Sequence, residues 1–126
     1  MEKTITICGK DVTFKASALT PRLYRHWIGR DMVRDMNSLR KAFTKLNNLP
    51  ADATDEERVD AELSVMDLEV FESVAWVMAR QADPTVKDNP DEWLDEFDMF
   101  SIYEIMPHIL MLWGMNEQTT SKAKKK

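Results

Sequence analysis

Apolar residues alternate with polar ones at the start of the chain and then follow helical spacing. The alternating positions are Ile5, Ile7, Val12 and Phe14. Alternation is typical of strands with one buried face, and Gly9-Lys10-Asp11 between the two runs predicts a β-hairpin over residues 3–15. A lone hairpin is marginal in water, so we expect it to pack on helices, with pairing of its edge to another chain as the alternative.

The next region, residues 20–46, has the spacing of one interrupted helix. Thr20 as N-cap and Pro21 at the first helical position mark its start. Gly29 predicts a break near Arg30-Asp31. The apolar stripe consists of Leu23, Trp27, Ile28, Met32, Met36, Leu39, Phe43 and Leu46. We expect a loop over residues 48–53.

A third region predicts the central helix of the fold. Thr54 and Glu57 fit a capping box, and Ala82-Asp83-Pro84 marks the end of the helix. One apolar stripe consists of Val59, Leu63, Met66, Val70, Val74 and Val77, and Leu68, Phe71, Ala75 and Met78 widen it. So broad an apolar face is typical of a helix that packs on two sides.

Two shorter helices are predicted in the last third of the chain. Asn89 as cap and Pro90 start the first, which carries Trp93, Leu94 and Phe97. Ser101 and Glu104 offer a capping box for the second. We expect Pro107 to kink that helix and Gly114 to end it. Its apolar residues are Ile102, Ile105, Ile109, Leu112 and Trp113.

These elements predict a mainly α protein. It consists of an N-terminal β-hairpin followed by a compact bundle of about four to five helices, in a single domain over residues 1–116. Residues 117–126 contain no apolar residue larger than alanine, so we expect a disordered, lysine-rich C-terminal tail.

The net charge of −5 conceals an uneven distribution. Residues 1–50 carry ten Lys and Arg against four Asp and Glu, whereas residues 51–116 carry three against seventeen. This asymmetry favours a surface that is complementary within the protein, with a polyanion-binding face as the alternative. Nucleic acid is disfavoured because so acidic a surface would repel phosphates.

No pattern for catalysis, metal binding or a cofactor stands out. His26 and His108 lie in separate predicted helices without cysteine or carboxylate partners at zinc spacing. The single cysteine, Cys8, fits a half-buried strand position, and phosphate-binding and nucleophile motifs are absent. We therefore expect no enzyme and no cofactor. With neither a signal peptide nor a membrane span in the pattern, we expect a soluble intracellular protein.

The segment from Asp91 to Asn116 is the strongest candidate for binding another protein. Its 26 residues include two of the four tryptophans, three other aromatic residues and four of the nine methionines. Aromatic side chains carry much of the energy of protein interfaces, and methionine adapts to different partners. The candidate partner-binding residues are Trp93, Phe97, Met99, Phe100, Met106, Met111 and Trp113.

Two runs in the second half of the chain resemble a known family. ESVAWVMARQADP (Glu72–Pro84) followed by EWLDEFDMFSIYEIMPHILMLWGMN (Glu92–Asn116) and a Thr/Lys-rich ending is similar to the tail assembly chaperones of long-tailed phages and prophages of Gram-positive bacteria. The N-terminal hairpin segment and the helix around LTPRLYRHW fit the same order. The resemblance covers nearly the whole chain and is loosest around residues 46–62.

The resemblance implies a role in phage tail morphogenesis. Such chaperones bind the tape measure protein, a long, hydrophobic helical chain, and keep it soluble until major tail (tube) protein subunits polymerise around it. They act in the host cytoplasm and are absent from the mature virion. Many also exist in a longer, frameshifted form, and Lys124-Lys125-Lys126 is compatible with a slippery codon run, although a solubilising tail explains these lysines equally well. Self-association is a further expectation.

Two other functions remain open at this point. A small intracellular adaptor or regulatory protein would bind one helical partner through Asp91–Asn116 in a one-to-one complex. A DNA-binding helical domain would use the basic residues of the region 22–45 and would shift DNA in a salt-dependent manner. We expect no such shift.

Overall fold

The structure is a computed structural model, and it describes residues 1–47, 52, 54 and 65–121. These residues form two strands and five helices, which confirms the mainly α fold with an N-terminal hairpin. Several expectations concern positions outside the described residues: Glu57 of the capping box that starts at Thr54, the core positions Val59 and Leu63, and the end of the tail at 122–126.

Strands β1 (Glu2–Ile7) and β2 (Lys10–Lys15) pair in antiparallel fashion, with Ile5 opposite Val12 and Ile7 opposite Lys10. The turn is Cys8-Gly9, one residue earlier than predicted. Both residues have positive φ, 52° and 77°, the combination that a type I′ hairpin turn requires. Cys8 is therefore exposed in the turn, and its predicted half-buried strand position is wrong.

The hairpin has one apolar and one polar face. Ile7, Val12 and Phe14 are buried in the core. On the other face, the hydroxyls of Thr4 and Thr13 lie 2.7 Å apart in a cross-strand hydrogen bond. The alternating pattern thus places the hairpin against the helices, as expected.

Helices α1 (Thr20–Ile28) and α2 (Met32–Asn47) follow the hairpin. Gly29 separates them with a φ of 82°, which confirms the predicted break. Thr20 is the first helical residue rather than the N-cap: its buried hydroxyl donates to Gln81 Oε1 at 2.6 Å and accepts the Ser17 N–H. The interaction with α4 thus replaces the local cap.

A buried polar network joins α1 to α2. The Tyr24 hydroxyl donates to Asp35 Oδ2 at 2.8 Å, and the Arg30 guanidinium donates to both Asp35 oxygens at 2.7 and 3.0 Å. Burial alone would raise the pKa of Asp35, but the hydrogen bonds from Arg30 and Tyr24 outweigh it and hold this pKa below its ordinary value. The carboxylate is therefore stabilised in its charged form.

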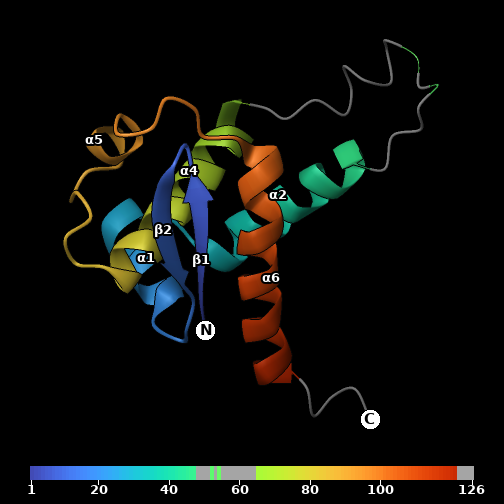
Figure 1. Ribbon diagram of the computed structural model, residues 1–126. Helices are drawn as coiled ribbons and strands as arrows, with labels where there is room; N and C mark the ends of the chain where they lie inside the picture. Colours follow the sequence, from blue (N-terminus) through green and yellow to red (C-terminus); the bar gives the residue numbers. More distant parts are fainter. Residues whose placement is uncertain (48–51, 53, 55–64, 122–126) are drawn as a thin grey trace.

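Helix α4 (Val65–Ala82) is the centre of the fold. It packs against β2, α1, α2, α5 and α6, as Figure 1 shows, and so confirms the expectation of a central helix. Its buried residues are Val70, Phe71, Val74, Ala75, Trp76, Val77, Met78 and Ala79. Met66 and Leu68, predicted on the buried face, are instead 52% and 39% exposed, and Leu68 lines an open groove beside Trp27 and Pro90.

Helix α5 (Pro90–Leu94) begins as predicted. The Asn89 side chain caps it by accepting the backbone N–H groups of Asp91 and Glu92 at 2.7 and 3.3 Å. Phe97 lies beyond the end of α5, in the connection to the last helix.

Helix α6 (Ile102–Ser121) contains Pro107 and contacts both α4 and β1. Gly114 does not end it, because α6 continues to Ser121 and Gly114 lacks the positive φ of a helix terminus. Residues 117–121 of the predicted tail thus belong to α6. The buried residues of α6 are Ile102, Ile105, Met106, Ile109, Leu112 and Trp113.

Candidate protein-binding site

Three of the predicted partner-binding residues form an aromatic cluster. Trp93, Phe97 and Phe100 have ring centroids 5.2 to 5.4 Å apart, and Phe71 of α4 lies 5.4 Å from Phe100. Edge-on and tilted contacts at these separations are favourable for aromatic rings. Trp93 and Phe97 are only 2% and 8% exposed. The cluster therefore holds α5 and the 95–101 connection onto α4.

The tip of the hairpin covers this aromatic cluster. Lys10 Nζ lies 5.5 Å from the Phe97 ring centroid and forms an ion pair with Glu96 at 2.8 Å. The Cys8 thiol donates to the Met99 carbonyl oxygen at 3.0 Å. The three contacts join segments that are far apart in the sequence.

Burial corrects the list of candidate partner-binding residues. Trp93, Phe97, Met106 and Trp113 are at most 8% exposed, so these side chains stabilise the domain and are not available to a partner. Phe100 is half-buried in the aromatic cluster. Met99 and Met111 are 69% and 44% exposed and therefore remain candidate partner-binding residues, although they lie on different elements.

A groove that sequence reasoning missed lies between α1, α4 and α5. Its volume is about 690 Å³, within the range of small ligand pockets. The apolar part of its lining consists of Trp27, Ile28, Leu68, Pro90 and Leu94. Trp27 and Leu68 are 40% and 39% exposed, whereas the pattern had placed both on core-facing stripes. The sequence feature that could have indicated the groove is the presence of two carboxylates, Glu69 and Glu72, beside the apolar Leu68.

Carboxylates line the rest of the groove. Glu69 and Glu72 come from α4 and Asp91 from α5, together with Ser73. Partial burial, then the nearby charges of Glu69 and Asp91, raise the pKa of Glu72 above its ordinary value. The groove therefore gathers three carboxylates that form no ion pair with any described residue.

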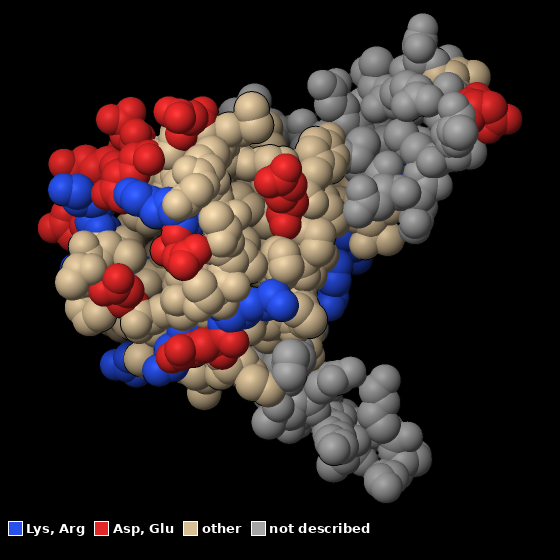
Figure 2. All heavy atoms as spheres, in the orientation of Figure 1, with Lys and Arg blue, Asp and Glu red and all other residues tan. Residues whose placement is uncertain are grey.

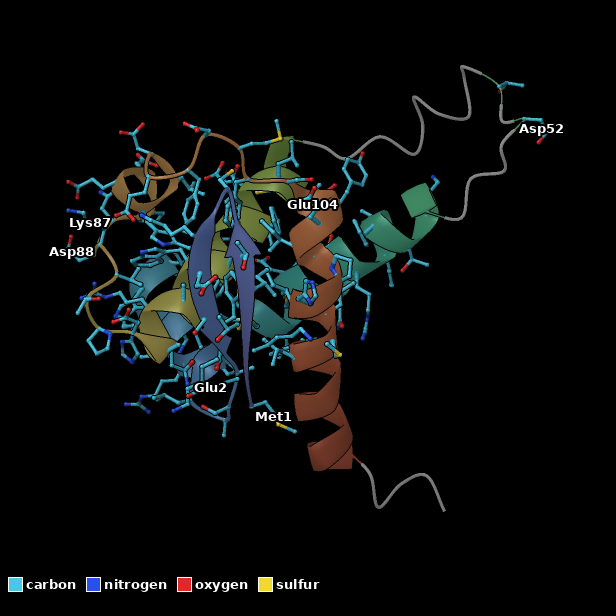
Figure 3. All side chains as sticks on the ribbon, in the orientation of Figure 1. Met1, Glu2, Asp52, Lys87, Asp88 and Glu104 are labelled. Carbon is cyan, nitrogen blue, oxygen red and sulfur yellow. The ribbon has the colours of Figure 1, made fainter. Side chains whose placement is uncertain are left out.

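The α5 end of the molecule is acidic beyond the groove. Figure 2 shows Asp and Glu side chains gathered over α5, at the upper left. The exposed carboxylates in this stretch are Asp91, Glu92, Asp95 and Glu96. Lys87 and Asp88 are exposed in the connection from α4 to α5 (Figure 3). A protein that docks here would encounter an acidic surface.

A second, more polar hollow of about 470 Å³ lies beside β2. Lys10, Asp11, Asp83 and Glu96 contribute to its lining, and Trp93 and Phe97 close its base. Most of its charged groups have local partners: Lys10 pairs with Glu96, and Asp83 accepts the N–H and hydroxyl of Thr85 at 2.9 and 2.7 Å. It is thus less suited to a partner than the groove.

Over the described part of the chain, no three His, Cys, Asp or Glu side chains are grouped as metal ligands. No helix there is long and apolar enough to span a membrane. Comparison of the chain with protein-family models, curated proteins and solved structures gives no match.

Proposed function

We propose that the protein is a tail assembly chaperone of a long-tailed phage or prophage of Gram-positive bacteria, which binds and solubilises the tape measure protein. The observation that carries the proposal is the resemblance of Glu72–Pro84 and Glu92–Asn116 to that family, in the same order. In the fold these runs form the second half of α4, the end of α5 and most of α6, and both α5 and α6 pack on α4.

The surface is compatible with this role on physical grounds. A chaperone for a long amphipathic helix needs exposed apolar side chains for capture and net charge to keep the complex dispersed. The groove at Trp27 and Leu68 meets the first need, and the net charge of −5 meets the second.

Many copies along one tape measure chain would gain affinity through avidity, so each contact can be weak. In this proposal the coat also recruits the major tail (tube) protein, acts in the host cytoplasm and leaves before the virion is complete. Self-association and a longer frameshifted product belong to the same proposal.

Co-expression tests this function. The partner is the product of the very long helical reading frame expected just downstream of the gene, produced with and without the chaperone candidate. We expect the soluble fraction of the long product to rise several-fold with the candidate and not with an unrelated acidic protein of similar size. An unchanged soluble fraction would contradict the proposal.

The adaptor alternative predicts a different stoichiometry. An adaptor would bind its helical partner one to one, whereas a chaperone coat requires many copies on each long chain. Light scattering of the purified complex distinguishes the two through its mass.

A further inference from the structure

We infer that the groove between α1, α4 and α5 binds an amphipathic helix that presents leucine-like side chains beside a lysine or arginine. The inference deepens the proposed function, on which it rests for the partner's identity as a tape measure segment. The site itself is defined by Trp27 and Leu68 in its apolar part and by Glu69, Glu72 and Asp91 beside them.

The apolar part of the groove has the size and exposure for side chains of a partner. Trp27 and Leu68 are each about two-fifths exposed, and Ile28 and Leu94 are half-buried at the edge of the core. Covering such apolar surface favours binding because it releases water. A row of branched apolar side chains on one helix face would fill this space.

Trp27 is held in place before any partner arrives. Its ring lies 5.5 Å from Trp76, whose indole N–H donates to the Lys87 carbonyl oxygen at 2.8 Å. The Arg80 guanidinium lies 5.7 Å from the Trp27 ring and donates to the Val86 carbonyl oxygen at 2.6 Å. A fixed, half-exposed tryptophan is typical of interface hot spots because little entropy is lost when it is covered.

The carboxylates define the charge of the occupant. Glu69, Glu72 and Asp91 form no ion pair with any residue that the structure describes. Partial burial, and after it the charges of Glu69 and Asp91, raise the pKa of Glu72. A lysine or arginine at the edge of an apolar helix face would neutralise the crowding, while its alkyl stem would cover Trp27 or Leu68.

Charge and apolarity together select among the possible occupants. An anionic ligand would be repelled by the three carboxylates. The lysine-rich end of a second copy has the right charge, but residues 117–126 contain no apolar side chain larger than alanine to cover Trp27. A basic amphipathic helix satisfies both halves of the groove.

The binding experiment uses three fluorescein-labelled peptides of about 20 residues, long enough to form helix on binding. One has a leucine stripe flanked by lysines, the second has glutamates in place of the lysines, and the third has alanines in place of the leucines. We expect the leucine–lysine peptide to bind the full chain. The other two should bind at least about tenfold more weakly, because the glutamate peptide loses the charge contacts and the alanine peptide loses the apolar contacts.

A matched pair of variants locates the site. The triple variant E69Q/E72Q/D91N removes the three groove charges, and E2Q/D98N/E104Q removes three exposed carboxylates elsewhere; Glu2 and Glu104 are labelled in Figure 3. We expect the first to weaken leucine–lysine binding roughly tenfold and the second less than about twofold, since long-range charge effects are screened. Equal losses in both variants would overturn the inference.

The indole N–H signals of the four tryptophans in a ¹H–¹⁵N NMR spectrum provide an independent readout. Trp27→Phe assigns one of these signals, and that signal should move most on addition of the leucine–lysine peptide. Binding that leaves the Trp27 signal unchanged would overturn the inference, whatever the affinity.

Two further outcomes separate this inference from the proposed function. Peptide binding at Trp27 without solubilisation of the long product would leave the groove assignment standing and contradict the chaperone role. Solubilisation that survives in E69Q/E72Q/D91N would leave the chaperone role standing and overturn the groove assignment. A third outcome concerns self-association. If it is lost both in E69Q/E72Q/D91N and in K122Q/K124Q/K125Q/K126Q, the groove binds the tail of a second copy, and the inference of a partner helix is overturned.

Discussion

The aromatic cluster and the groove lie on two sides of α5 and differ in what surrounds their rings. The cluster consists of Trp93, Phe97, Phe100 and Phe71, and the groove contains Trp27. Trp93 is 2% exposed and meets other rings and the hairpin tip, whereas Trp27 is 40% exposed and has carboxylates nearby. Abundance of aromatic residues in a segment therefore marks core as readily as contact surface. An aromatic ring with one open face beside unpaired charge is the better sign of a binding site.

The sharpest test of this comparison is a pair of tryptophan truncations. Trp93→Ala should lower the free energy of unfolding by about 4 kcal/mol, because it leaves a cavity under the aromatic cluster. Trp27→Ala should cost only about 1 kcal/mol, because much of that ring already faces water. Urea denaturation followed by circular dichroism measures both. Equal losses would show that the cluster and the groove do not differ in the way their burial indicates.

A second test concerns Asp35, a carboxylate that is paired, unlike those of the groove. Asp35→Ala should cost about 3 kcal/mol, since it leaves the Tyr24 hydroxyl buried without its acceptor and Arg30 without its ion pair. Tyr24→Phe, which removes one hydrogen bond, should cost about 1 kcal/mol. A loss below that of Tyr24→Phe would contradict the central position of Asp35 in the network.

The pH dependence of the same network has a defined sign. The folded-state pKa of Asp35 lies below its ordinary value, so its contribution to stability is fully present above that ordinary pKa and is lost as the pH falls through the folded value. Wild type should therefore lose stability below about pH 4 more steeply than Asp35→Asn, which cannot titrate there. Parallel curves for the two proteins would argue against a lowered pKa.

The regular parts of the fold could be predicted because local rules and burial agree there. Met32, Met36, Leu39 and Phe43 are all buried at their three- and four-residue spacing, and Gly29 separates the helices as expected. The Asn89 cap likewise depends only on its own neighbourhood in the chain.

The errors occur where a distant segment decides the outcome. Thr20 loses its capping role because Gln81 provides its hydroxyl with a hydrogen-bond partner, and Leu68 stays 39% exposed because it lines the open groove beside Trp27. Gly114 lies within α6, where nothing requires a positive φ. The groove escaped prediction for the same reason, since Trp27, Leu68 and Asp91 become neighbours only through packing.

The cover over the aromatic cluster provides a third, smaller test. Lys10→Ala removes the ion pair with Glu96 and the contact with Phe97, and we expect a loss of about 0.5 to 1 kcal/mol because the pair is partly exposed. Lys15→Ala, at the opposite end of β2, is the matched control, with an expected change within about 0.5 kcal/mol. A larger loss in the control would mean that strand propensity, rather than the cover, is being measured.

The smallest expected effect tests whether the groove is arranged for binding at the expense of stability. Glu72 has a raised pKa, so its charged form disfavours folding at neutral pH, and this disadvantage disappears as the pH falls below the ordinary pKa of a glutamate. Glu72→Gln should therefore stabilise the domain at pH 7 by about 0.3 kcal/mol after allowance for solvent screening.

The same change should weaken binding of the leucine–lysine peptide, so stability and affinity should move in opposite directions. Glu104→Gln, an exposed carboxylate on α6, should change neither. Thermal unfolding of both variants at pH 7 and pH 4 measures the stability effect. Destabilisation by Glu72→Gln at pH 7 would contradict the prediction, because it would show that the Glu72 carboxylate already has favourable interactions within the protein.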